Sequence, residues 1–271
     1  MKLKKIINKC YCGIDGFISN DKDFTLVEQY IIHNLEILKE FKGVIVASNY
    51  LDLKLSKQHN EIWTKYFPDC IILDLPENRG HSFGSADLDD SIFDYCKENN
   101  IEWLCKMAND ILLFEELLEK EVDKSDFYYL EGIGKGGMAN YNFDIDKILK
   151  EYFFPQTNFY IINVTKTDYL NNKDYINETY NECNKIPKQV WEGIFFKKPW
   201  GPFPGWANEK FLAECIERNN LSKFHLIPPK KFITLLGIVN KADIHDCSHK
   251  NIKIEGVLHF HDPEEKILIL E

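Results

Sequence analysis

Long hydrophobic runs are missing from this sequence of 271 residues. A membrane-spanning helix needs roughly 18 or more consecutive apolar residues, and no stretch of the chain approaches that length. The lysine-rich start is followed only by Ile6 and Ile7 before the polar Asn8, which is too short for the apolar core of a signal peptide. We therefore expect no transmembrane segment, signal peptide or membrane anchor, and a cytoplasmic location.

The chain also lacks an excess of positive charge. Its formal net charge is -10 at pH 7, and its pI is about 5.4. Binding to a nucleic-acid backbone depends on clustered Lys and Arg residues, because these release counterions. The composition therefore argues against nucleic acid as the main partner, although a local basic patch could still hold a phosphate.

Cysteine pairs with the C-x-x-C spacing are absent. Most of the eight cysteines fall inside apolar helix or strand patterns, which is typical of reduced, buried thiols in a cytosolic protein. Strand alternation would point Cys10 and Cys12, the one close pair, to the same face, and this does not favour a zinc site. A glycine cluster at 132–137 lacks the spacing and the Lys-Ser/Thr of a Walker loop, so it does not predict a P-loop.

What the sequence does contain is enough apolar residues, 44% by composition, to build a sizeable core. Up to residue 113, strand-like and helical segments alternate. We expect strands at 5–14, at 43–48, from Ile71 onward and at 101–113, and helices at 24–41, 58–67 and 83–100. Because crossovers between parallel strands are right-handed, this alternation predicts an open parallel sheet with helices on both faces.

The second half of the chain is less regular. We expect helices at 114–122 and 208–218, strands at 126–131 and 159–164, and a polar helix or loop at 168–188. Residues 191–212 combine three tryptophans, three prolines and three glycines, which predicts an irregular, rigid loop before the last of these helices.

A polar pair, Asn109-Asp110, interrupts the apolar run at 101–113. A carboxylate between two buried runs must meet a ligand, a partner or a cation. The alternative is a turn, because Asn and Asp side chains readily hydrogen-bond nearby backbone. The strand from Ile71 ends in the glycine-ended loop 77–80, so both segments would meet at the carboxyl ends of adjacent strands, where α/β sheets bind ligands.

Three further residues have both a functional and a structural interpretation. Glu209 lies in the first turn of a helix beside Trp200 and Trp206, so it is either a capping carboxylate or a base next to aromatic platforms that hold sugars. His259 and His261 alternate along a short apolar strand, so one of them could ligate a metal, or both could be incidental surface residues.

The order of elements resembles the GT-A fold of nucleotide-sugar glycosyltransferases, with family 2 as the nearest pattern, over roughly residues 5–113. Three segments carry the resemblance. Residues 77–84 are similar to the Asn-x-Gly loop before the donor-side helix. Residues 103–113 resemble the strand that ends in the Asp-x-Asp motif, with Ala108-Asn109-Asp110 where members often have three aspartates. Residues 204–212 are similar to the acceptor-side motif whose acidic residue opens a helix.

The resemblance implies an α/β fold of GT-A type, an open, mainly parallel sheet flanked by helices with an irregular acceptor-side C-terminal half. It implies one domain over 1–271, in which 1–113 bind the nucleotide sugar and 114–271 form the acceptor side and tail. The implied activity is that of a hexosyltransferase-like, inverting enzyme, which moves a sugar from the donor to a glycan or another hydroxyl acceptor.

The resemblance also implies roles for individual residues. Because Ala108 and Asn109 replace carboxylates, only Asp110 is carried over as a ligand of Mn²⁺ or Mg²⁺, completed by His259 or His261. Glu209 would be the base. The acceptor would contact Trp200 and Trp206, and the donor would contact Cys12, Gly13, Asn49, Asp52, Asn78, Gly80, Asn109 and Asp110.

Two other classes of protein fit the same pattern. A nucleotidyltransferase shares the sheet and an Asp-bound cation, but it usually has a basic, glycine-rich loop after the first strand, whereas residues 12–17 contain no Lys or Arg. A non-catalytic member that binds a glycan or a partner is allowed by the depleted Asp-x-Asp site.

Overall fold

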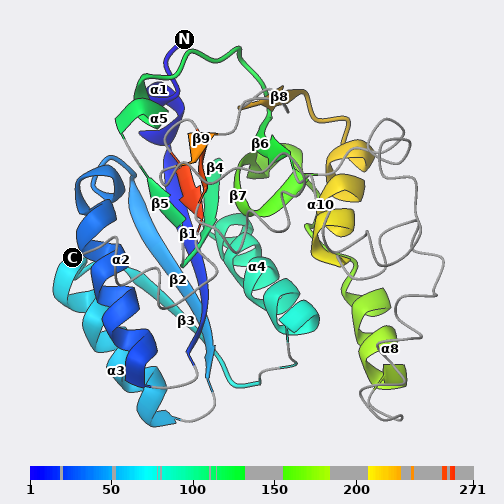
Figure 1. Cartoon of the computed structure of the whole chain (residues 1–271). Helices are drawn as coiled ribbons and strands as arrows, with labels where there is room; N and C mark the ends of the chain where they lie inside the picture. The colour runs from blue at the N-terminus through cyan, green and yellow to red at the C-terminus, as the bar shows by residue number, and fades with distance from the viewer. Residues whose placement is uncertain are drawn as a thin grey trace.

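The protein is built around a seven-stranded mixed sheet in the part of the chain that the structure, a computed structural model, describes (Figure 1). The described residues are 1–18, 21–50, 53–77, 79, 81–109, 111–113, 115–131, 155–183, 207–226, 233–234, 252–254 and 257–259. The strands are, in spatial order, β3 (Ile71–Leu75), β2 (Gly43–Tyr50), β1 (Cys10–Ile18), β4 (Trp103–Ala108), β7 (Pro155–Asn163), β6 (Phe127–Glu131) and β8 (Lys223–His225). Strand β7 is antiparallel to both neighbours, and the other adjacent pairs are parallel. The predicted α/β class, with an open, mainly parallel sheet, is confirmed.

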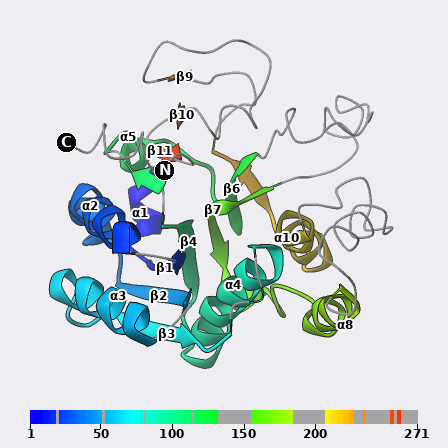
Figure 2. The same ribbon diagram turned by 60° about the horizontal axis from the view of Figure 1, so that its bottom comes forward.

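Helices cover both faces of this sheet, as predicted (Figure 2). One face carries α2 (Asp21–Leu38) and α3 (Leu53–Tyr66), and the other carries α4 (His81–Glu98) and α10 (Ala207–Arg218). The remaining described helices are α1 (Lys4–Ile7), α5 (Glu115–Glu119), α8 (Lys173–Cys183) and the short 3-10 turn η1 (Val164–Lys166). None of the helices described here has the length and apolar character needed to cross a membrane.

The core lies in two layers because neighbouring residues of each buried strand point to opposite faces. On the α2 and α3 face, Val46 of β2 packs in a cluster with Ile31 and Trp63. On the α4 and α10 face, Ile45 of the same strand packs in a cluster with Ile92. Burying one such aliphatic side chain stabilises the fold by about 1.5–3 kcal/mol. The continuous apolar runs of the sequence are therefore needed to cover both faces.

Strand β1 differs from the expected strand at 5–14. Residues 4–7 form α1, and β1 runs on past Cys12 and Gly13 to Ile18, so Asp15 and Gly16 belong to the strand and not to a loop. The expected boundary was wrong because pairing with β2 on one side and β4 on the other holds the backbone extended despite its two glycines. Gly13 is needed for packing, since a Cβ there would lie 2.5 Å from Ile92 Cγ2.

The apolar run at 101–113 forms two strands instead of one. It ends β4 at Ala108 and resumes as β5 (Ile111–Leu113), which pairs with β11 (Val257–His259) in a second sheet. The other strands described in that sheet are β10 (Ile252–Ile254) and β9 (Ile233–Thr234). The Asn34 side chain of α2 receives a hydrogen bond from Leu113 N at 2.7 Å and donates one to Ile111 O at 3.0 Å. Asn34 thereby takes the place of a neighbouring strand at one edge of β5.

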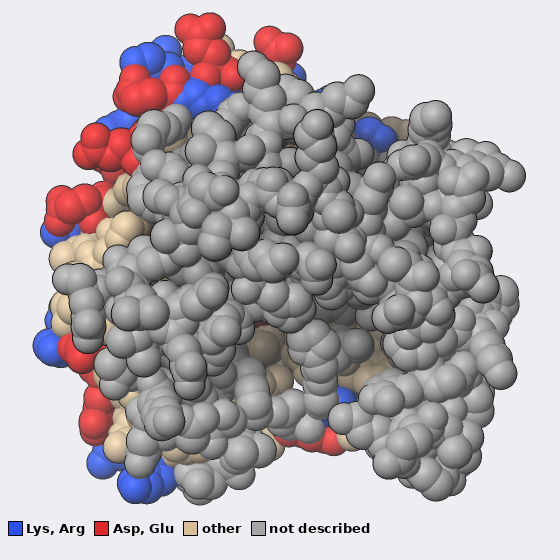
Figure 3. All heavy atoms as spheres, in the orientation of Figure 1, with Lys and Arg blue, Asp and Glu red and all other residues tan. Residues whose placement is uncertain are grey.

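The described surface carries both signs of charge. On the face shown in Figure 3, Lys and Arg lie interspersed with Asp and Glu along the side of the molecule that carries α1, α2 and α3. Ion pairs there include Lys4 with Glu40 at 2.7 Å and Lys65 with Glu28 at 2.7 Å. Exposed pairs of this kind each contribute only about 0–1 kcal/mol. They set the surface charge pattern more than the stability.

Candidate functional site

The candidate site lies at the carboxyl-terminal edge of the parallel strands. Strand β1 is followed by β2 on one side and has β4 on its other side, so the ends of β1 and β4 form a topological switch point, the usual place for a ligand crevice. Asn109, the residue after β4, donates its backbone N–H to the carbonyl oxygen of Asp15 at 3.0 Å. Its side chain packs directly on Gly16, where an added Cβ would lie 2.5 Å from Asn109 Nδ2. Gly16 is therefore required for Asn109 to occupy this place.

A buried cluster of charged side chains lies next to the contact between Asn109 and Gly16. Lys106 Nζ is 3.0 Å from Asp15 Oδ1, 3.1 Å from Asp89 Oδ1 and 2.6 Å from the carbonyl oxygen of Thr157. The Lys106 side chain is only 3% exposed. Burial alone lowers the pKa of this ammonium group, but the Asp15 and Asp89 carboxylates outweigh it and raise the pKa above the ordinary value for lysine. Lys106 is therefore charged, and it ties β1, β4, α4 and β7 together beneath the edge.

Strand register explains how this cluster forms. Gly13 pairs with Lys106 and Asp15 pairs with Ala108, so alternation turns Lys106 and Asp15 toward the α4 face, where Asp89 lies. Our sequence reasoning missed these three charged residues. The signal was Lys106 itself, because a lysine inside a buried apolar strand requires an anion nearby.

Asn49 contributes a polar group at the end of β2. The side chain is 2% exposed, and its Nδ2 lies 3.5 Å from the carbonyl oxygen of Gly84 in the first turn of α4. Asn49 Oδ1 has no hydrogen-bond partner among the described residues. A buried acceptor in this condition is costly unless a ligand or water donates to it. Its position supports the predicted role of Asn49 in binding a donor.

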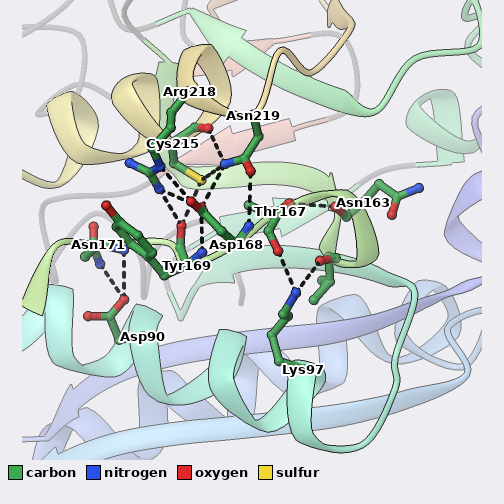
Figure 4. A network of polar contacts seen from close by, with 11 residues as sticks. Asp90, Lys97, Asn163, Thr167, Asp168, Tyr169, Asn171, Cys215, Arg218 and Asn219 are labelled. Atoms are coloured by element: carbon green, nitrogen blue, oxygen red, sulfur yellow. Dashed lines mark hydrogen bonds and ion pairs between the residues drawn. The ribbon is translucent and has the colours of Figure 1, made fainter.

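Helices α4 and α10 both begin at this edge of the sheet. Their last turns lie at the opposite edge, where polar contacts hold them (Figure 4). In the last turn of α4, Lys97 donates to the carbonyl oxygen of Thr167 at 2.6 Å. At the end of α10, Arg218 forms a two-pronged ion pair with Asp168, at 2.9 and 2.8 Å. Both acceptors follow β7, whose last residue pairs with Trp103, the first of β4. The starts of both helices, which carry partial positive charge, therefore point toward the ends of β1 and β4.

The structure does not bring two of the predicted donor ligands to the edge. Cys12 is fully buried near the start of β1, and Gly13 is covered by Ile92 and Leu104. Burial raises the pKa of the Cys12 thiol well above its ordinary value. Asp15 and Gly16 are the residues of β1 that lie beside the end of β4, because the strand is longer than expected and runs on to Ile18.

Most of the other predicted site residues lie outside the described residues: Asp52, Asn78, Gly80, Asp110, Trp200, Trp206 and His261. For Glu209 and His259 the backbone is described and the side chain is not. Glu209 lies in the first turn of α10. His259 lies in β11, opposite Ile111, the residue that follows Asp110.

One backbone pairing bears on the predicted metal site. The described residues alone contain no group of three His, Cys, Asp or Glu side chains that could hold a metal. The pairing of β5 with β11, however, brings the strand that contains His259 alongside the residue after Asp110. A carboxylate and an imidazole are both suitable ligands for Mn²⁺.

Comparison with known proteins gives matches among solved structures, where 164 chains are similar to this one. No protein-family model matches the chain, and no curated protein does so. Among solved structures, the chain is similar to the galactosyltransferase LgtC in complex with donor and acceptor sugar analogues, with a TM-score of 0.44 and 6% sequence identity. The alignment covers 96% of this chain and 95% of that chain. A similarity this weak indicates neither the donor, nor the acceptor, nor the mechanism.

Proposed function

We propose that this protein is a glycosyltransferase that moves a sugar from a nucleotide-sugar donor to a hydroxyl group of a glycan or another acceptor. The observation that carries the proposal is the convergence of three distant segments. The start of α4, the end of β4 and the start of α10 belong to the three stretches that resemble GT-A enzymes, and they lie at one edge of the sheet.

The donor would bind across the ends of β1, β2 and β4. Asn49 and Asp52 would contact the base and ribose, and the buried Asn49 Oδ1 would accept an N–H or O–H from them. The diphosphate would lie near Asn78 and Gly80, where the positive end of α4 favours anions. Asn109 would be the polar contact at the tip of β4.

Asp110, with His259 or His261, would hold a Mn²⁺ or Mg²⁺ ion. When bound, such an ion neutralises the negative charge that the departing nucleoside diphosphate acquires, which is worth several kcal/mol of barrier. The backbone pairing of His259 with Ile111 supports this assignment.

Glu209 would act as general base in an inverting displacement. It would take the proton from the acceptor hydroxyl while that oxygen attacks the anomeric carbon from the side opposite the diphosphate. A positioned base of this kind contributes roughly 10²–10⁴-fold to the rate. Trp200 and Trp206 would hold the acceptor sugar, since aromatic faces pack well against apolar faces of sugars.

A donor panel tests the proposal. UDP- and GDP-sugars are added to the purified chain with and without Mn²⁺, and thermal unfolding and release of nucleoside diphosphate are measured. A donor present at 100 times its Kd should stabilise the protein by about 2.7 kcal/mol. Asp110→Asn should abolish diphosphate release and keep the unfolding temperature of the free protein. If no nucleotide sugar shifts unfolding or is consumed, the proposal is wrong; binding without turnover would instead indicate a non-catalytic binding protein.

A further inference from the structure

Arg79, in the loop between β3 and α4, has its guanidinium group engaged on several sides. Its Nε donates to Asp87 Oδ2 at 2.7 Å, and its Nη2 pairs with the other oxygen of the same carboxylate. Its Nη1 donates to Asn177 Oδ1 of α8 at 2.7 Å. The ring of Tyr180, also in α8, lies 4.8 Å from the guanidinium carbon. The side chain is only 13% exposed.

Helix α8 makes two more contacts, one on each side of this loop. Tyr180 packs edge-on against Phe83 in the first turn of α4, with ring centroids 5.3 Å apart. Its hydroxyl lies 3.5 Å from Glu77 Oε1, at the start of the loop. Residues on both sides of Arg79 are therefore tied to a helix that lies about 100 positions later in the chain.

These contacts bear on how an arginine in this loop can act. An arginine beside a predicted diphosphate site would ordinarily be expected to bind phosphate directly, because its planar fork matches the oxygens. Here the two-pronged face is occupied by Asp87, and one ring face is covered by Tyr180. Direct binding would require Arg79 to break a partly buried, bidentate ion pair.

We propose that Arg79 is a positioning residue: it clamps the segment between β3 and α4 to α4 and α8, and thereby positions the start of α4 for a nucleoside diphosphate. The clamp does not contact the ligand itself. This inference rests on the proposed function, since it assigns the loop to the diphosphate of the donor.

The clamp and direct binding predict different effects for Asn177→Ala, which changes no charge. If Arg79 only positions the loop, loss of the Asn177 contact loosens the loop and weakens binding. If Arg79 binds phosphate directly, Asn177→Ala frees the guanidinium, and affinity stays the same or rises. The matched control is Lys173→Gln, which breaks another ion pair between α8 and α4, with Asp94, away from the loop.

The test is calorimetric titration of the full chain with UDP and with GDP, each in the presence of Mn²⁺. We expect Asn177→Ala and Arg79→Lys each to raise Kd about tenfold, in line with the loss of a hydrogen bond to a charged group. The double variant should bind the nucleotide no more weakly than Arg79→Lys alone, because both changes open the same clamp. Lys173→Gln should bind as the unchanged protein does. Weaker binding by Arg79→Lys together with unchanged or tighter binding by Asn177→Ala would overturn the clamp.

Hydrogen exchange keeps this inference separate from the proposed function. If the unchanged protein binds neither nucleotide, the proposed donor is wrong, and the clamp is then judged on the free protein. Asn177→Ala should speed exchange of the backbone amides of residue 79 and residues 81–84, while Lys173→Gln should not. Equal exchange at these amides in both variants would overturn the clamp.

Discussion

At the scale of single residues, the ammonium group of Lys106 lies within ion-pair distance of both Asp15 and Asp89. Lys106→Met keeps the length of the side chain but removes the charge, and with it the ion pairs to the Asp15 and Asp89 carboxylates. Breaking a buried ion pair in this way costs about 3–5 kcal/mol. We expect a loss of that size in the free energy of unfolding, measured by urea titration.

The control for Lys106→Met removes the whole cluster. Replacing a complete buried ion cluster by apolar groups of similar volume is often close to neutral for stability, and asparagine removes the charge of an aspartate while keeping its shape. The triple variant Lys106→Met, Asp15→Asn, Asp89→Asn should therefore recover most of the loss. An unfolding midpoint for Lys106→Met equal to that of the unchanged protein would show that the cluster does not hold the sheet.

A second prediction at the scale of single residues concerns His59 and the pH dependence of stability. The side chain is 1% exposed, its Nε2 accepts from Trp63 Nε1 at 3.1 Å, and its Nδ1 lies 3.2 Å from Ser48 Oγ. Burial lowers the pKa of His59 from 6.5 to about 4, and the Asp74 carboxylate only partly opposes this shift.

The lowered pKa of His59 determines the sign of the effect. Above about pH 6.5 the imidazole is neutral in both states and carries no penalty. Between about pH 6.5 and pH 4 the unfolded chain takes up a proton that the folded protein does not, so stability falls as the pH falls. The total loss is about 3 kcal/mol. Urea unfolding at a series of pH values should show this dependence in the unchanged protein and a flatter one in His59→Gln; equal slopes in both would contradict it.

At the scale of helices and strands, the periodic patterns located most of the first half. Strands β2 and β3 and helices α2 and α4 lie where the apolar spacing predicted them, because burial on both faces of a parallel strand, or on one face of a helix, is recorded in local sequence. Strand β1 was placed too early. Its extension through Gly13 and Gly16 depends on two neighbouring strands, and no local pattern records them.

The division of the 101–113 run into β4 and β5 was also beyond local reasoning. The polar pair 109–110 was correctly singled out as an interruption, but a turn within one strand and a passage between two sheets look alike in sequence. What separates them is the Asn34 side chain in α2, which bonds the backbone of β5 on one edge, and β11, which pairs with its other edge. Both partners lie far away in the chain.

The pairing of β5 with β11 leads to a prediction about the tail. Because His259 lies opposite Ile111, we expect one of His259 and His261, and not both, to ligate the metal with Asp110. Manganese titration of His259→Ala and His261→Ala should show a loss of affinity of about tenfold or more in one variant only. His225→Ala, in β8 at the far edge of the main sheet, should bind as the unchanged protein does. Unaltered affinity in both tail variants would remove these histidines from the metal site.

At the scale of the whole molecule, the two halves of the chain meet at the edge where the strands end. The first half supplies the ends of β1 and β4, and the second half supplies α10, whose direction follows from its anchoring by Arg218 behind β7. Sequence reasoning placed Glu209 in the first turn of a helix but could not orient that helix. The antiparallel β7, which returns the chain to the opposite edge, determines this orientation.

A substitution of Glu209 separates the two interpretations of this residue, a helix-capping carboxylate and a general base. Glu209→Gln keeps the shape and most of the hydrogen bonding of a helix-opening residue but cannot accept a proton. If Glu209 only stabilises the start of α10, the change should lower the free energy of unfolding by at most about 1 kcal/mol and leave kcat unchanged. If it is the base, kcat should fall by roughly 10²-fold or more, with little change in donor affinity.

The matched control for Glu209 lies in the same helix. Glu217→Gln changes an exposed carboxylate near the other end of α10, and it should alter neither kcat nor donor affinity. We expect Glu209→Gln alone to lose turnover while both variants unfold at nearly the same urea concentration. That result would require the second half of the chain to act on a sugar bound by the first, since Glu209 is about 100 residues away from Asp110. An unaltered kcat in Glu209→Gln would leave α10 a packing element and would withdraw the support for an inverting mechanism.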